Sequence, residues 1–200
     1  VFFGLCSFLL IEILRIGKKI SEKIKISKPL KGMIAGLILI MIALFFSTDY
    51  LGLGLEVIES SLSGQPLAWY AFILKSLTTS LTLNFGGSGG IVTPVFFVGS
   101  SAGNLFAQLL NLDIVLFSAL GFVGLLAGAA NAPIAASIMA IELFGPEIAP
   151  YAALVCVISF LMTGHRSVYP SQILSFRKSR LIDIELGKEI EQSKTVTTKN

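Results

Sequence analysis

The sequence has few charged residues, few cysteines and a single histidine, and these shortages exclude several classes of protein. Charged residues make up 14% of its 200 residues, whereas soluble domains have about 25%. Hydrophobic residues make up 54%, too much apolar surface for one soluble core or for a disordered chain. The two cysteines, Cys6 and Cys156, lie in apolar runs and are too few for a disulfide scaffold. The composition therefore predicts an integral membrane protein.

The sequence contains no residue set suited to catalysis or to metal binding. His165, the only histidine, has no second ligand at the spacing of metal sites. Neither an H-E-x-x-H nor a C-x-x-C pattern occurs, and no serine, histidine and aspartate set can be assembled. We therefore expect a protein that is not an enzyme and that carries neither a metal nor a cofactor.

The basic residues lie near the two ends of the chain. Between Gly32 and His165 the only one is Lys75. Because lysine and arginine gather on the cytoplasmic side of membrane proteins, residues 18–31 and 177–180 are expected to face the cytoplasm. No aromatic residues for base stacking are interleaved with these basic residues, so we expect no nucleic-acid partner.

The apolar segments are short and are interrupted by glycine or proline. Several are shorter than the ~17 residues that a membrane span needs. Interrupted helices occur at membrane depth only where protein or a cavity surrounds them, and transporters point the N-termini of such half-helices at anions. The pattern predicts helices over residues 1–25, 31–46, 51–62 (a partial helix), 67–83, 91–110, 114–129, 133–144 and 148–162, and a short one that starts at Tyr169-Pro170. Small residues four apart predict close helix packing at Gly32/Gly36, Gly99/Gly103 and Gly124/Gly128.

A glycine-rich loop precedes the helix expected over residues 91–110. The loop consists of Gly86, Gly87, Ser88, Gly89 and Gly90. Pro94 follows, in the first helical turn, where its missing N–H is tolerated. Such a loop can point backbone N–H groups at an anion, with the positive end of the helix dipole behind them. A phosphate-binding P-loop would need Gly-Lys-Ser or Gly-Lys-Thr, and a dinucleotide fingerprint would need a preceding strand. An anion site and a plain turn between two helices both stay open.

Five motifs occur in an order and spacing that resemble one family. They are LGLG (51–54), Lys75 with LTTSLTL (77–83), GGSGGIVTPVFFVGSSAG (86–103), LAGAANAPIAASIMAIELFG (126–145) and TGHRSVYPSQ (163–172). The set resembles the C-terminal half of CLC-type chloride channels and chloride/proton antiporters over residues 1–178, and a short polar cytoplasmic tail would follow over 179–200. The resemblance implies an all-α membrane fold, in which tilted and broken helices form the second of two inverted repeats.

The resemblance also implies an anion site. The family's G-x-F-x-P motif matches Gly90 to Pro94, and its anion-coordinating tyrosine matches Tyr169. The backbone amides of Ile91 and Val92 and the Tyr169 hydroxyl would then hold the anion, with residues 86–89 and Pro94 supporting the loop. Val92 stands where phenylalanine is usual and Thr93 where alanine is common, so the shape of the pocket differs from the family pattern.

The implied function is transport of chloride, by a channel of the voltage-gated type or by an antiporter that also moves protons. The gating glutamate and a serine-containing loop belong to the family's first repeat, which this chain does not match, so the choice between channel and antiporter stays open. The chain would need that first repeat, and the family implies a homodimer in the bilayer. We expect no long nucleotide-binding module after Arg180, and therefore a protein of the prokaryotic plasma membrane.

Two alternative transport functions remain. The ELFG stretch and the GH-x-x-x-Y pattern also resemble fluoride-exporting branches of the family, so fluoride is one alternative substrate. An unrelated transporter with broken helices is the other, although a cation carrier would place carboxylates at the breaks and residues 86–94 contain none. A membrane scaffold that transports nothing is a third reading, but it has no need for a glycine-rich half-helix start.

Two charged residues lie inside apolar segments. Lys75 is expected to pair with a carboxylate or to tune the electric field that anions meet. Glu142 is an acid inside an apolar helix, where charged groups are often functional. It lies near the end of that helix, so we expect it to be a structural partner or an interface residue.

Overall fold

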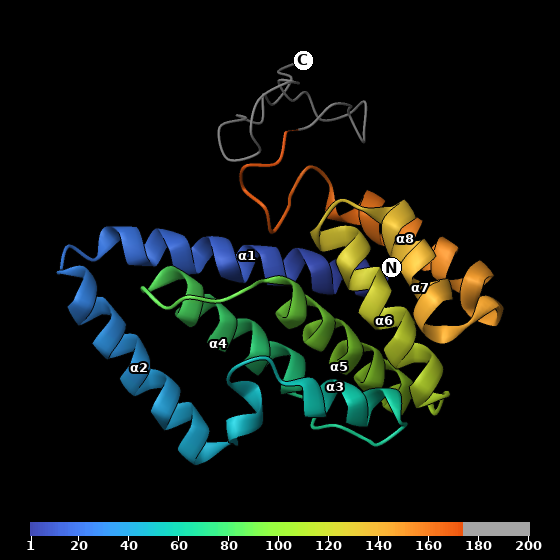
Figure 1. The fold of residues 1–200 in the computed structure, drawn as a ribbon, viewed down its shortest axis with the longest axis horizontal. Helices are drawn as coiled ribbons and strands as arrows, with labels where there is room; N and C mark the ends of the chain where they lie inside the picture. The colour runs from blue at the N-terminus through green and yellow to red at the C-terminus, as the bar shows by residue number, and fades with distance from the viewer. Residues whose placement is uncertain (174–200) are drawn as a thin grey trace.

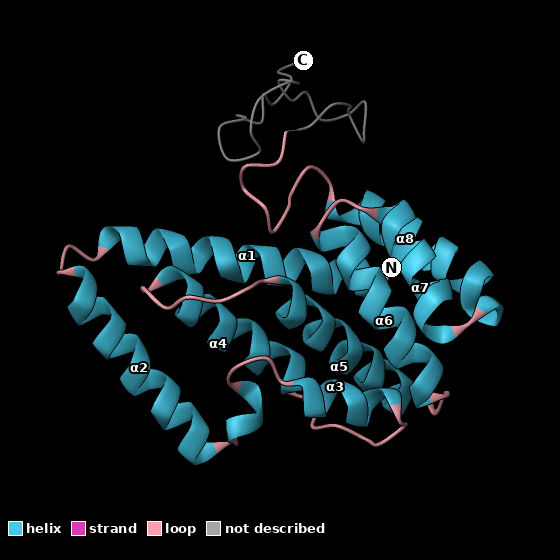
Figure 2. Cartoon of the chain, viewed as in Figure 1, coloured by secondary structure: helices cyan, strands magenta, loops and turns pink. Residues whose placement is uncertain are grey.

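A computed structural model describes residues 1–173 and confirms the all-α prediction (Figures 1 and 2). This part of the chain folds into eight α-helices and two 3-10 helices and contains no β-strand. The elements are α1 (Phe2–Lys23), α2 (Lys28–Phe45), η1 (Thr48–Tyr50), α3 (Leu55–Leu62), α4 (Ala71–Asn84), α5 (Val92–Leu110), α6 (Ile114–Ala129), α7 (Pro133–Phe144), η2 (Pro146–Ile148) and α8 (Ala149–Thr163). Residues 169–172 form a turn, so the short helix expected from Tyr169-Pro170 does not begin there. The tail over 179–200 lies outside the described residues.

Proline and glycine determine where several helices begin. Pro133 is the first residue of α7, and Pro29 lies in the first turn of α2, positions where the fixed backbone of proline favours a helix. Because of Pro29, α2 starts three residues before the expected boundary. α3 starts four residues later than expected, since Gly52 and Gly54 adopt left-handed backbone conformations that keep residues 51–54 outside the helix.

The closest helix pair, α5 and α6, confirms one of the predicted small-residue contacts. A Cβ atom on Gly103 would lie 2.7 Å from the carbonyl carbon of Phe117 and 2.9 Å from Cα of Ser118. Gly99 and Gly121 meet in the same way across this interface. Only glycine lets the two backbones approach so closely.

The other two predicted glycine pairs differ. Gly124 and Gly128 on α6 face Val155 and Thr163 on α8, which confirms close packing there. At Gly36 on α2, in contrast, no described atom lies within 4 Å of the point that a Cβ would occupy. A Cβ on Gly32 would make only an ordinary contact, 3.7 Å from the carbonyl oxygen of Phe85. The expectation of close packing at Gly32/Gly36 is therefore wrong within the described chain, because α2 stands away from the bundle (Figure 1).

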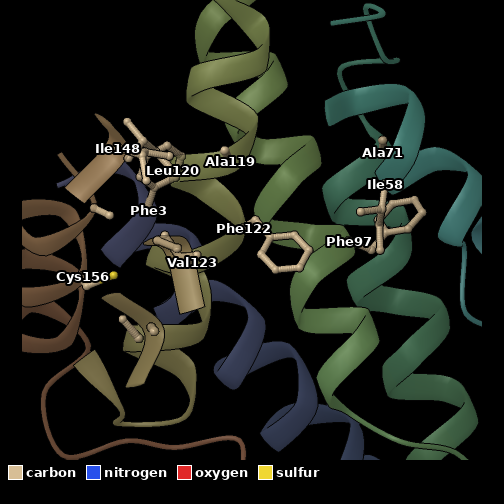
Figure 3. Packing of buried hydrophobic residues seen from close by; sticks show 14 of the residues in the cluster. Phe3, Ile58, Ala71, Phe97, Ala119, Leu120, Phe122, Val123, Ile148 and Cys156 are labelled. Carbon is tan, nitrogen blue, oxygen red and sulfur yellow. The ribbon is translucent and has the colours of Figure 1, made fainter. Parts of the chain in front are cut away.

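Two clusters of buried apolar side chains hold the bundle together. The larger cluster includes Phe3, Phe97 and Phe122 (Figure 3). It joins α1, α3 and α4 to α5, α6, α7 and α8. The smaller cluster lies between α1, α5 and α6 and consists of Cys6, Leu10, Val95, Val98, Ala102, Leu125 and Ala129. The smaller cluster positions the candidate site, because both segments of that site pack against it.

The length and composition of two helical segments suit a membrane crossing. They are residues Lys28–Phe45 and Pro146–Thr163, each 18 residues long. Much of the apolar surface of the bundle is exposed, and α2 buries only Ala35. Exposed apolar helices of this length are expected where lipid or another protein segment covers them.

Candidate functional site

The N-terminus of α5 presents backbone N–H groups without a side-chain cap. Ile91 occupies the cap position and offers no side-chain acceptor. The N–H of Val95 donates to the carbonyl of Ile91 at 3.1 Å, so the N–H groups before Val95 lie ahead of that hydrogen bond. These groups carry the positive end of the dipole of a 19-residue helix. The helix start can therefore attract an anion without a charged side chain.

The glycine loop folds back tightly at its start and is open near its end. Gly86 has a φ of +103°, and the N–H of Gly87 donates to the carbonyl of Thr82 at 2.9 Å. A Cβ on Gly87 would lie 2.7 Å from that carbonyl oxygen, so this position requires glycine. At Gly90, in contrast, no described atom lies within 4 Å of the place where a Cβ would stand. The backbone beside Ile91 and Val92 is thus accessible, and Val92 itself is 41% exposed.

The segment that carries Tyr169 is bonded to the end of α6. The N–H of Val168 and the hydroxyl of Ser167 both donate to the carbonyl of Ala129, at 2.9 and 3.2 Å. The N–H of Tyr169 donates to the hydroxyl oxygen of Ser167 at 3.1 Å. Hydrogen bonds made by residues 167–169 therefore hold the backbone of Tyr169, while its side chain stays partly exposed.

Four residues to which the sequence assigned no role complete this anchor, namely Glu12, Asn131, Arg166 and Gln172. Asn131 donates from its amide nitrogen to the carbonyl of Arg166 and to the side-chain oxygen of Gln172, both at 3.1 Å. Arg166 in turn forms an ion pair with Glu12 of α1, with 3.0 Å between Nε and Oε1. In the sequence, Asn131 stands at the break between two predicted helices, just before Pro133, and in the structure it is one of two non-glycine residues with positive φ in the described chain.

The same core supports both parts of the site. Ile91, just before α5, and Val168, just before Tyr169, pack against the smaller apolar cluster. The predicted site residues Ile91, Val92 and Tyr169 therefore belong to two segments that pack against the same set of buried side chains, although more than 70 positions separate them in the sequence. The structure brings the helix start and the tyrosine segment to the same region of the bundle.

Lys75 and Glu142 lie apart from this site. Lys75 is 1% exposed and donates to the carbonyls of Tyr50 and Gly52, and no carboxylate among residues 1–173 pairs with it. Its expected carboxylate partner is therefore replaced by backbone carbonyls. Glu142 is exposed on α7 and forms no ion pair within the described residues, so this part of the chain does not supply a partner for it.

The described residues offer no evident metal site. No three histidine, cysteine, aspartate or glutamate side chains gather at distances that would hold a metal ion in this part of the chain. Basic side chains are likewise missing from residues 85–94. Residues 85–94 therefore offer amide dipoles and the hydroxyls of Ser88 and Thr93, and Tyr169 adds a phenolic hydroxyl.

Comparison with known families identifies the family of this chain. The family model described as voltage gated chloride channel matches residues 1–164, which is more than half of the chain. The chain belongs to this family, the CLC proteins. It is accordingly an integral membrane protein, as its composition predicts.

Individual CLC relatives are similar over most of the chain. A chloride/fluoride channel protein of Pseudomonas syringae pv. tomato is 43% identical over 129 residues, which cover 64% of this chain and 28% of that protein. A voltage-gated ClC-type chloride channel of Escherichia coli is 30% identical over 180 residues, which cover 83% of this chain and 43% of the relative. The chain thus spans less than half the length of these relatives.

A solved CLC structure has the same fold. The crystal structure of a CLC-type fluoride/proton antiporter superimposes with a TM-score of 0.79 at 31% sequence identity, over 84% of this chain and 43% of the other. The match confirms the family resemblance that the ordered motifs indicate.

Proposed function

We propose that this chain forms the second half of a transmembrane pathway for anions, with chloride as the substrate. The start of α5 and the Tyr169 segment pack against the same apolar cluster, and this observation supports the proposal. The amides of Ile91 and Val92 and the hydroxyl of Tyr169 would bind the anion. Its membership of the CLC family, whose named relatives include chloride channels, supports this function.

Amide dipoles and a hydroxyl suit transport better than a fixed positive charge would. A helix N-terminus carries roughly half an elementary charge, which favours anion entry. A tyrosine hydroxyl adds one directional donor. Conduction also needs release, and a lysine or arginine in direct contact would hold a halide too firmly for rapid exit. We therefore propose a transporter that binds its substrate weakly and does no covalent chemistry.

Fluoride is the second candidate substrate. It is favoured by the similarity to a chloride/fluoride channel protein and to a fluoride/proton antiporter, both of which are above 30% identical to this chain. Val92 and Thr93, which depart from the family pattern, lie at the start of α5, where they would shape the pocket. A small, strongly hydrated anion places different demands on this pocket than chloride does.

The assembly around the chain is also a proposal. We propose that residues 1–178 pair with a first repeat, which would supply the gating glutamate and decide between a channel and a proton-coupled antiporter. We further propose a homodimer through the apolar faces of α7 and α8, where Ile134, Ile138, Leu154 and Val157 are exposed. The protein would lie in a prokaryotic plasma membrane, and the basic residues near both ends favour a C-terminus in the cytoplasm.

Anion efflux from liposomes tests the proposal. The full-length protein that contains this chain is reconstituted, and chloride and fluoride efflux are compared with and without a pH gradient. Chloride efflux that moves protons indicates an antiporter, and chloride efflux without protons indicates a channel. A preference for fluoride favours the second candidate. Absence of halide efflux from folded protein contradicts the proposed function.

A further inference from the structure

Lys75 places a positive charge inside the bundle, on the inner face of α4. Its ammonium donates to the carbonyl of Gly52 at 2.7 Å and to that of Tyr50 at 3.3 Å. The ring of Phe97 lies beside it, with 4.9 Å between Nζ and the ring centroid. An ammonium has three N–H donors, so two carbonyls and one aromatic face can accept all three.

The loop before α3 is shaped to turn these carbonyls inward. Gly52 and Gly54 have φ of +56° and +71°, which reverses the chain within a few residues. Gly54 lies against the ring of Phe97, where a Cβ would stand 2.6 Å from a ring carbon. The hydroxyl of Thr78 also donates to the carbonyl of Tyr50 at 3.0 Å, which fixes its direction. The carbonyls of Tyr50 and Gly52 and the ring of Phe97 thus form a cage around the ammonium of Lys75. The loop and α5 supply all three groups of this cage.

The charge in this cage has no acidic partner in the described chain. No carboxylate among residues 1–173 forms an ion pair with Lys75, so within this part of the chain the carbonyl dipoles and the ring stabilise its charge. Carbonyl oxygens and aromatic faces are the groups that also coordinate potassium and ammonium ions in proteins. The donor set thus has the chemistry of a site for a monovalent cation.

We propose that the carbonyls of Tyr50 and Gly52 and the face of Phe97 form a monovalent-cation site that Lys75 fills with its own ammonium. The filled site joins the loop over residues 50–54 to α4 and α5. Truncation of the side chain leaves room for a free cation, and ions close to ammonium in size, namely ammonium and potassium, bind there better than the smaller sodium ion.

Thermal unfolding of two variants tests this site. The full-length protein and its Lys75→Ala and Lys75→Met variants are unfolded in chloride salts of ammonium, potassium, sodium and N-methyl-D-glucamine. We expect Lys75→Ala to unfold about 5 °C below the parent in N-methyl-D-glucamine, because the carbonyl of Gly52 loses the ammonium as its donor and that of Tyr50 keeps only the hydroxyl of Thr78. We expect ammonium or potassium to restore at least half of this shift. Methionine fills the space of the lysine, so Lys75→Met is not restored by any cation.

A lysine at the edge of the bundle provides the matched control. Lys31 donates to the carbonyl of Ser21, but it is only half-buried and has no cage around its ammonium. Lys31→Ala should therefore respond to the four salts as the parent does. If Lys75→Ala does not fold in N-methyl-D-glucamine, recovery of monodisperse protein in ammonium against N-methyl-D-glucamine becomes the measurement.

Three outcomes overturn the proposal. They are a Lys75→Ala variant as stable as the parent in every salt, a loss of stability that no cation reverses, and equal restoration of the alanine and methionine variants. Thermal unfolding tests the cation site, and halide efflux from the parent protein tests the proposed anion transport. Because unfolding does not depend on transport, each proposal can fail without the other.

Discussion

The N–H of Val168 donates to the carbonyl of Ala129 at 2.9 Å, and this bond joins the tyrosine segment to the last residue of α6. α6 packs along its length against α5, whose first turn forms the other half of the candidate site. The packing of α5 against α6 therefore determines where Tyr169 lies relative to the start of α5. The bonds around this pair determine how substitutions should affect the site.

Asn131→Gly should loosen the tyrosine segment. Glycine accepts the left-handed backbone of Asn131, whose φ is 58°, but removes the amide that bonds Arg166 and Gln172. Two lost hydrogen bonds should lower the free energy of unfolding by about 1–2 kcal/mol. Halide affinity measured by calorimetry should fall as well. Asn111→Gly is the control, since Asn111 has a similar φ of 51° and lies exposed at the end of α5. An equal loss of affinity in both variants would contradict the anchoring role.

Tyr169→Phe should weaken anion binding without unfolding the protein. The change removes one hydroxyl donor and leaves the bonds made by Val168 and Ser167 in place. Because a hydrogen bond to a charged group contributes ~1.5–3 kcal/mol, halide affinity should fall about tenfold or more. Isothermal titration with chloride and fluoride measures this. Tyr151→Phe, on an exposed face of α8, should leave affinity unchanged. Unaltered affinity in Tyr169→Phe would remove the tyrosine from the proposed site.

Gly103→Ala should destabilise the helix pair. The added methyl group would meet the backbone of Phe117 and Ser118 at 2.7 and 2.9 Å, and backbone cannot rotate away. Such overpacking costs about 1–3 kcal/mol or more. Gly36→Ala on α2 meets open space and should instead gain up to ~1 kcal/mol from helix propensity. Thermal unfolding of the two variants measures the difference, and equal stability would show that α5 and α6 are not packed through glycine.

Val92→Phe should change halide preference with little effect on stability. The side chain of Val92 is 41% exposed at the start of α5, so a larger residue meets no buried neighbour in the described chain. Since the ring would narrow the approach to the proposed amides, the ratio of chloride to fluoride efflux should shift several-fold. Leu109→Phe, near the opposite end of α5 and 69% exposed, is the control. An unchanged ratio would mean that Val92 does not line the pathway.

Local features made much of the fold predictable. Proline in the first turn of a helix and glycine between helices act within a few residues, so the breaks before α5 and α7 could be located from the sequence. The glycine pair on α5 was predictable for a similar reason, because two small residues four apart always share one helix face.

Long-range contacts made other features unpredictable. The partner of Lys75 lies more than 20 positions away, in carbonyls that any sequence could supply, so no side-chain pattern indicates it. The anchor of Tyr169 joins Glu12, Asn131 and Arg166 across three separate segments. Gly32/Gly36 shows the opposite case, since a motif for close packing lies on a helix that stands apart.

The sequence by itself determined that this is a membrane protein of the CLC family with a glycine loop before a half-helix, because composition, order of motifs and local backbone preferences are properties of the chain alone. The tertiary structure alone decided which of those features meet. Hydrogen bonds to backbone carbonyls and packing against a shared core depend on where distant segments lie in space, and that information is not contained in any short stretch of residues.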